Sequence, residues 1–208
     1  MAKLDTLLTR VLDEFPAVAQ TVALRALSDA TKEFCTRSGA WQDSLDPIAI
    51  VAGQDTYDVS LDTGLQLVAL VDVRVDGKKV YPVATELARL RDNTPGNGSP
   101  RGYVQWGPST IELIRPPADA AQLTVKAALT LALGNTSVDV TDSVLDEYGE
   151  YIACGAKARL VRQSNQPWYA PDAVTGYAGP FYDAINNAKR RANTALGSAE
   201  VQVQMREW

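Results

Sequence analysis

The sequence predicts an α+β protein, in which a four-helix bundle of two N-terminal and two C-terminal helices carries an inserted antiparallel β region. Apolar residues recur at helical spacing near both ends of the 208-residue chain. Residues 46–133 instead alternate between apolar and polar side chains, with Gly, Asp and Pro between the alternating runs. We therefore expect residues 1–45 and 134–197 to form the bundle, residues 46–133 a sandwich-like or barrel-like β domain, and residues 198–208 an extended C-terminal tail.

Two apolar stripes separated by a proline predict the N-terminal helices. Residues 3–14 form the first stripe. The Phe15-Pro16 step ends it, because the residue before a proline disfavours the α conformation. We expect a second helix to begin near Pro16, a tolerated first-turn position, and to end at Gly39.

The inserted region is predicted to hold roughly six to seven short strands. Two strands are expected around a Gly53-Gln54 turn, and Asp76-Gly77 predicts a hairpin. Residues 84–92 are expected to form a short helix and residues 93–102 a loop. A second hairpin turns at Gly107-Pro108-Ser109, and a last strand, from Leu123 to Leu133, is expected to bulge at Ala127-Ala128.

The C-terminal helices differ in their side-chain bulk. The first is expected to start at Thr141 or Asp142, and its middle is rich in Gly and Ala, which would let a second helix approach closely. The last helix is expected from about Tyr177 or Pro180 to Leu196. The segment between the two helices is predicted to be a loop.

An aromatic segment, QPWYAPDAVTGYAGPFYDAI, spans residues 166–185 and contains no basic residue, His or Cys. Large aromatic side chains contribute most when they are buried. They could therefore plug the end of the bundle or pack against a neighbouring subunit. The candidate residues for a bundle or subunit interface are Trp168, Tyr169, Tyr177, Phe181 and Tyr182.

The composition excludes several kinds of chemistry. Histidine is absent, which removes the usual general base and the usual zinc ligand. The two cysteines, Cys35 and Cys154, are expected to be buried free thiols. A net charge of −5 argues against a DNA clamp but suits a channel that repels phosphate. We expect no catalytic residue, no metal, no cofactor, no signal peptide and no membrane span.

Several segments, in chain order over about residues 22–195, resemble the bacteriophage adaptor (head-to-tail connector) proteins of podophage-like tailed phages. The most specific is GEYIACGAKARLVRQSNQPWYAPDAVTGYAGPFYDAINNAKRRA. It is similar to the family pattern of Ile-Ala-x-Gly-Ala, Pro-Trp, and a helix of the form Phe-x-x-x-Ile-x-x-Ala. Upstream segments also resemble the family, namely LRALSDATKEFCTRSGAWQD, GQDTYDV, VDVRVDGKKVYPV and SPRGYVQWGPSTIELIRPPA.

The resemblance implies a structural virion protein without catalytic residues. Such adaptors form a dodecameric ring beneath the portal, contact tail or nozzle proteins, and let DNA pass without sequence-specific binding. The chain would be made in the host cytoplasm, would be monomeric before assembly, and would reside at the neck of the virion. The C-terminal tail would bind the portal, and its alternating residues are suited to adding a strand to a partner's sheet. The proposed portal-binding residues are Val201, Val203, Met205, Arg206 and Trp208.

Three other interpretations remain open at this stage. The chain could be a neck or head-completion protein of a longer-tailed phage. It could be a ligand-binding β module with Tyr103 and Trp106 as a stacking platform. It could be an enzyme that uses paired carboxylates, such as Asp142 with Asp146 or Glu147 with Glu150, although acidic residues are common near helix N-termini. The basic cluster of residues 189–191 is expected to be solvated or paired with a neighbour's acidic face.

Overall fold

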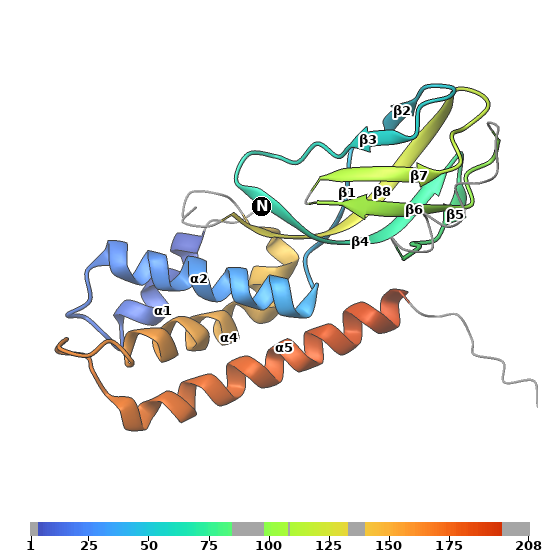
Figure 1. The fold of residues 1–208 in the computed structure, drawn as a ribbon. Helices are drawn as coiled ribbons and strands as arrows, with labels where there is room; N and C mark the ends of the chain where they lie inside the picture. Colours follow the sequence, from blue (N-terminus) through green and yellow to red (C-terminus); the bar gives the residue numbers. More distant parts are fainter. Residues whose placement is uncertain (1–3, 85–97, 108, 133–139, 197–208) are drawn as a thin grey trace, which may run out of the picture.

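The computed structural model describes residues 4–84, 98–107, 109–132 and 140–196, and it confirms the α+β class with antiparallel sheets. Helices occupy one part of the molecule and strands the other, with α5 running along the outside of the helical part toward the β part (Figure 1). The predicted C-terminal tail and nearly all of the predicted helix at 84–92 lie outside the described residues.

The first helix is shorter and the second starts later than the sequence suggested. A 3-10 turn, Leu4–Leu7, leads into α1, Leu8–Leu12. Helix α2 spans Gln20–Ser38 instead of starting near Pro16. The reason is that residues 15–19 form a turn, which ends at Ala19 in an extended conformation with ψ 138°. Gly39 ends α2 as expected, in the left-handed region at φ 62°.

The last helix, α5, begins before its predicted start. Helix α4 spans Asp142–Leu160, a 3-10 turn covers Pro171–Ala173, and α5 spans Val174–Leu196 with Pro180 inside it. A proline deprives the carbonyl four residues earlier of its hydrogen bond. That carbonyl belongs to Gly176, and both Gly176 and Pro180 are exposed, so water can satisfy it. The helix therefore continues through the proline.

The strands form two antiparallel sheets, and no closed barrel is found among the described residues. One sheet has the order β1-β8-β4-β5, with β2 also paired to β8, and the other has the order β3-β7-β6. Seven of the described strands lie within residues 46–133, in agreement with the predicted six to seven, and an additional strand, β1, precedes them. The strands are β1 Gln42–Ser44, β2 Ile48–Ile50, β3 Thr56–Asp58, β4 Leu65–Val75, β5 Lys78–Val80, β6 Gly102–Trp106, β7 Thr110–Ile114 and β8 Ala121–Leu131.

Both predicted hairpins form, and the two strands predicted around the Gly53-Gln54 turn are present. The β4–β5 turn has Asp76 and Gly77 both at positive φ, 48° and 77°, as a tight Asp-Gly turn requires. Strands β2 and β3 do not pair with each other, because β2 joins β8 and β3 joins β7 in the other sheet. The Gly53 turn thus carries the chain from one sheet to the other.

The predicted bulge lies at the expected height in the sheet but on the opposite strand. The register between β4 and β8 shifts between Leu67 and Ala69 and again between Leu70 and Asp72. At both places the extra residue belongs to β4, while the facing Ala127-Ala128 of β8 is continuous. Bulges bend the strand that carries them, so β4 is the strand that curves.

Two hydrophobic cores hold the molecule together. The larger core joins all the described helices to the end of the sheet nearest to them, through Trp41, Leu67, Leu129 and Leu131. The second core contains side chains from both sheets, among them Tyr57, Val73, Tyr103, Ile111 and Val125. The helical part and the β part are therefore fused through a shared core at their junction.

Candidate interaction surfaces

The structure spreads the aromatic segment between the interior and the surface. Phe181 is almost completely buried, at 1% exposure. Trp168, Tyr177 and Tyr182 are half-buried, and Trp168 and Tyr182 pack against the larger core. Tyr169 is 49% exposed. Four of the five residues thus contribute to packing within the chain, and Tyr169 presents most side-chain surface to a partner.

The small residues of α4 admit α5 and the N-terminal segment, as the sequence predicted. A Cβ atom placed on Gly155 would lie 2.6 Å from Cδ2 of Phe181. A Cβ atom on Gly149 would lie 2.9 Å from Cδ2 of Leu7. The Phe181 ring also lies 6.2 Å, centroid to centroid, from Phe34 of α2. Phe181 therefore connects α5 to both α4 and α2.

Glu14 fastens the N-terminal segment to α4 and α5. Its carboxylate accepts hydrogen bonds from Nζ of Lys157, at 2.5 Å, and from the hydroxyl of Tyr177. Burial raises the pKa of Glu14, but the two hydrogen bonds and the Lys157 charge outweigh that effect and lower it. Burial and the Glu14 carboxylate raise the pKa of Tyr177 to about 12. This contact could not be predicted from the sequence, because its partners are far apart along the chain.

A second polar cluster ties α2 to α4 and α5. Glu33 of α2 forms ion pairs with Arg159 of α4 and, at 2.9 Å, with Arg37 of its own helix. The Arg37 guanidinium lies 4.9 Å from the ring centroid of Tyr182, a cation–π arrangement that links α2 to α5. The Arg159 guanidinium lies 5.7 Å from the ring centroid of Phe181.

The carboxylates considered for catalysis lie on the outer surface of α4. Asp142, Asp146, Glu147 and Glu150 are all exposed. Glu147 forms an ion pair with Arg191 of α5 at the rim of an open groove between the two helices. This geometry gives the carboxylates a surface role and does not place them across an enclosed cleft, which glycoside hydrolysis would need.

The two aromatic residues considered for ligand binding differ in their exposure to solvent. Tyr103 is 5% exposed and belongs to the core between the two sheets. Trp106 is 37% exposed, and its indole N–H donates to Glu112. The two rings therefore cannot share an exposed stacking platform, and this part of the ligand-binding interpretation is wrong.

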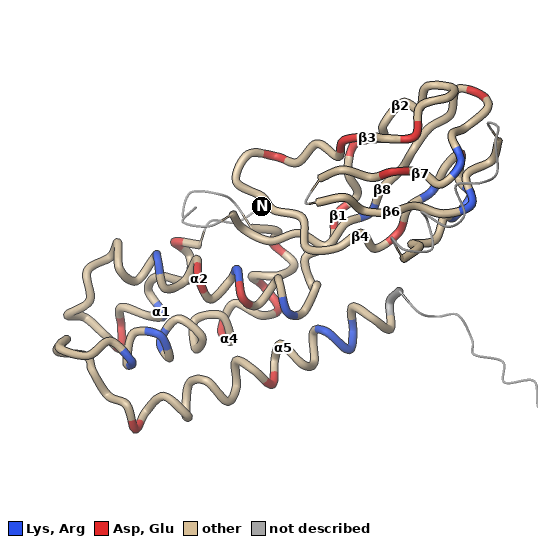
Figure 2. The backbone as a smooth tube through the Cα atoms, viewed as in Figure 1, with Lys and Arg blue, Asp and Glu red and all other residues tan. Residues whose placement is uncertain are grey.

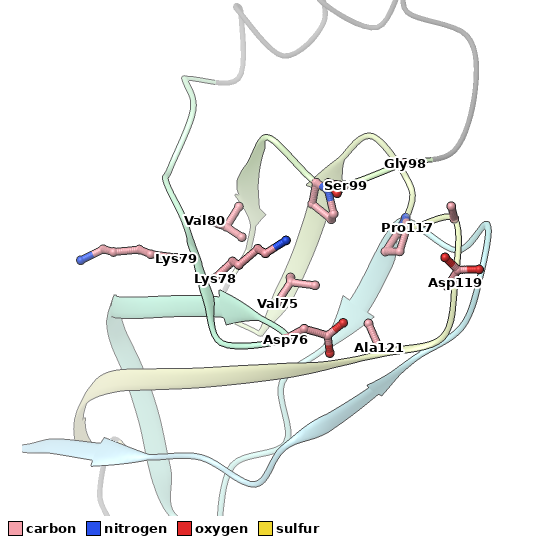
Figure 3. Close-up of a pocket in the computed structure, with 12 residues that line it drawn as sticks. Val75, Asp76, Lys78, Lys79, Val80, Gly98, Ser99, Pro117, Asp119 and Ala121 are labelled. Carbon is pink, nitrogen blue, oxygen red and sulfur yellow. The ribbon is translucent and has the colours of Figure 1, made fainter.

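A small hollow lies at the tip of the β4–β5 hairpin (Figure 3). Asp76, Lys78, Ser99 and Pro117 are among its lining residues. One carboxylate oxygen of Asp76 accepts the backbone N–H of Gln122 at 2.9 Å, so this carboxylate supports the turn. The volume of about 150 Å³ is below the several hundred Å³ typical of small-molecule sites.

The described residues offer no metal cluster, because no group of three or more His, Cys, Asp or Glu lies together within them. Both cysteines are free thiols. Cys35 is completely buried, and burial raises the pKa of its thiol to about 12. Cys154 is half-buried rather than buried, and its pKa is also raised by burial. Within the part that the structure describes, no helix is long and apolar enough to cross a membrane.

The family comparison agrees with a fold whose polar residues serve packing and surface contacts. The model of a family described as SU10 adaptor protein matches residues 2–206, which is nearly the whole chain. The chain therefore belongs to the SU10 adaptor protein family, and the predicted resemblance to phage adaptors is confirmed. It is a bacteriophage structural adaptor protein, a virion component of the neck. A search of curated proteins finds no match to the chain.

Proposed function

We propose that the chain forms a dodecameric ring beneath the portal, connects the capsid to the tail, and leaves a channel through which DNA passes. The observation that supports this proposal is the family match over residues 2–206. The net charge of −5 fits a channel wall that does not retain phosphate, so DNA would pass without sequence-specific binding. The chain would be made in the host cytoplasm and would be monomeric until it meets the portal.

The C-terminal tail is the proposed portal anchor. Helix α5 ends at Leu196, and Figure 1 shows that it extends past α4 before the chain leaves the helical part. The following residues alternate in a pattern that could add a strand to a portal sheet, and a terminal tryptophan is a typical interface anchor. The proposed contacts are Val201, Val203, Met205, Arg206 and Trp208, all outside the described residues.

We assign binding partners to the remaining surfaces from their place in the fold. In this proposal the helical part, residues 1–45 and 134–197, lies against the portal, and the inserted part, residues 46–133, faces tail or nozzle proteins. The bundle-plus-sandwich arrangement of these parts remains a prediction. Tyr169, with its exposed ring, is the proposed subunit contact within the aromatic segment. Trp168, Tyr177, Phe181 and Tyr182 would hold the turn that presents it.

The proposal is tested by mixing the chain with the portal ring from the same genome and weighing the complexes by native mass spectrometry. The chain is used at full length, truncated after Gly197, and with Trp208→Ala alone. A matched control, Thr194→Ala, changes an exposed residue of α5 just before the tail. We expect full-length and control chains to load on the portal in a fixed multiple, the truncated chain not to load, and Trp208→Ala to load weakly.

Loading of the truncated chain as well as the full-length chain would show that the tail is not the anchor. Failure of every form to load would contradict the portal contact itself. A neck protein of a longer-tailed phage would then be tested in the same way with its own ring partner.

A further inference from the structure

The strand order gives the β region two opposite edges. In the larger sheet, β1 and β2 pair with one side of β8, while β4 and then β5 lie on its other side. In the smaller sheet, β3 and β6 are the two edges. A short turn joins β2 to β3. The segment that follows β5 forms two backbone hydrogen bonds with Tyr103 of β6: the Tyr81 carbonyl accepts from the Tyr103 N–H, and the Val83 N–H donates to the Tyr103 carbonyl. One edge is therefore made of β1, β2 and β3, and the other of β5 and β6.

The β1–β2–β3 edge is acidic. From Ser38 to Val73 the chain contains no Lys or Arg. Asp55 and Asp58 accept hydrogen bonds from Thr56 and Thr110, but no aspartate of this edge forms an ion pair within the described part of the chain. Figure 2 shows acidic positions along β3. The exposed aspartates of this acidic edge are Asp43, Asp46, Asp55, Asp58 and Asp62.

The β5–β6 edge is basic. Its exposed cations are Arg74, Lys78, Lys79 and Arg101, and Figure 2 shows basic positions gathered at this end of the β region. Two of the carboxylates among them are already engaged. Asp72 pairs with Arg74 at 2.6 Å and with Lys79 at 3.3 Å, and Asp76 accepts the Gln122 backbone N–H. A third carboxylate, Asp119, lines the hollow beside Lys78 and Lys79. The four cations thus exceed the three carboxylates, and the edge remains positive.

We propose that the acidic edge of one copy binds the basic edge of a second copy of this chain. Two acidic edges repel each other, as do two basic edges, so the charges disfavour a symmetric pair and favour contact between unlike edges. Such a contact joins different surfaces of the two copies, which is the kind that closes into a ring when repeated. The inference rests on the proposed function, in which copies of the chain assemble side by side.

The test uses two charge-reversed chains. Asp46→Lys, Asp55→Lys, Asp58→Lys and Asp62→Lys together leave Asp43 as the one aspartate of the acidic edge and make both edges basic. Lys78→Glu with Lys79→Glu makes both edges acidic. A control chain reverses two exposed charges on the N-terminal segment, Asp5→Lys with Asp13→Lys. Circular dichroism and urea unfolding confirm that each chain folds. Association is then measured by native mass spectrometry and sedimentation in low salt, for each chain alone and for the two reversed chains mixed.

In the proposed function the isolated chain is monomeric at low concentration, so the chains are compared at high concentration, where weak self-association can be measured. There we expect each reversed chain to self-associate roughly tenfold less than the unmodified chain, and the mixture to associate at least tenfold more than either alone. The mixed complexes should contain both chains in equal amounts and weaken as salt screens the charges. A mixture that associates no better than its separate chains would overturn the proposal.

The outcome of the portal experiment can be distinguished from the outcome of this one, because the two reversed chains are mixed without a portal. If the two reversed chains bind each other while no form loads on the portal, the edge contact stands and the proposed portal contact fails. If unmodified chains load on the portal but the mixture shows no gain, the edge contact fails and the proposed function stands. Association of the control chain should equal that of the unmodified chain; an equal loss in the control would also overturn the proposal.

Discussion

The helical part and the β part use their charged residues in different ways. In the helical part, carboxylates reach cations on other elements: Glu14 pairs with Lys157, Glu33 with Arg159, and Glu147 with Arg191. In the β part, the aspartates of the acidic edge have no ionic partner among the described residues. The helical charges therefore hold this chain together, whereas the edge charges remain available for contacts with other molecules.

Packing follows the same division. In the helical part, α5 approaches α4 so closely that Gly155 has no space for a side chain beside Phe181. In the β part, the second core lies between the two sheets, and the outer strands β1, β2, β3 and β5 have three residues each. Short, charged edge strands resist uncontrolled pairing with other sheets. The comparison predicts that substitutions affect stability in the helices and assembly at the sheet edges.

The largest loss of stability is expected for Phe181→Ala. Removing a fully buried phenylalanine should cost about 3–5 kcal/mol of unfolding free energy, because it leaves a cavity between α2, α4 and α5. Urea unfolding monitored by circular dichroism measures it. Tyr169→Ala, in the same segment but exposed, should change the value by less than about 0.5 kcal/mol. Similar losses for the two substitutions would contradict the assignment of Phe181 to the interior.

The next largest effects on the unfolding free energy are expected for two Gly→Ala substitutions, and they have opposite signs. Gly155→Ala should destabilise the fold by about 1–3 kcal/mol, because the added Cβ would meet the Phe181 ring at 2.6 Å. Gly176→Ala places its Cβ in open space within α5 and should stabilise by about 0.4–1 kcal/mol. Thermal and urea unfolding of the two variants measure these changes in stability. Equal effects would mean that α4 and α5 are not in tight contact at Gly155.

The Glu14 contact should make stability depend on pH at both extremes. The lowered pKa of Glu14 contributes stability above its unfolded value, near 4.5, and this is lost as pH falls through the lower folded value. The raised pKa of Tyr177 means that stability falls as pH rises from about 10 toward about 12. Glu14→Gln should cost roughly 0.2–1 kcal/mol at neutral pH and flatten the acid side of the profile.

Unfolding measured across the pH range checks this prediction, with Tyr177→Phe as the matched variant for the alkaline side. Unchanged acid-side and alkaline-side slopes in both variants would exclude the contact as a source of pH dependence.

The smallest effect is expected at the acidic edge. Asp46→Asn and Asp62→Asn should each change the stability of the isolated chain by less than about 0.5 kcal/mol, because neither carboxylate has an ionic partner among the described residues. Glu33→Gln, which removes a charge shared by two arginines, should cost more. Differential scanning calorimetry of the three variants ranks them. A large loss at Asp62 would show that the acidic edge serves the fold of this chain.

Regular periodicity was sufficient to predict the element types, but tertiary contacts determined several boundaries. The Asp76-Gly77 hairpin and the Gly39 helix end were predictable, since each depends on local backbone conformation. Strand β1, Gln42–Ser44, was missed because its polar residues show no alternation and only pairing with β8 makes it a strand. The bulge was assigned to the wrong strand for the same reason, since a register shift belongs to a pair of strands.

The surfaces were less predictable than the fold. The sequence indicated that the aromatic segment takes part in packing or in an interface. Only the burial seen in the structure shows that Phe181 belongs to the interior and Tyr169 to the surface. The Glu14–Lys157 and Glu33–Arg159 ion pairs join residues more than a hundred positions apart, for which one sequence carries no signal. The opposite charges of the β edges also become visible only when the strand order is known.

The central claim, that this adaptor forms a ring between portal and tail, is tested most directly by cryo-electron microscopy of the virion neck. We predict a ring of this chain against the portal, with its C-terminal tail on the portal surface and the acidic edge of each copy facing the basic edge of the next. A neck without this chain, or a chain bound as isolated copies with no contact between neighbours, would contradict the account.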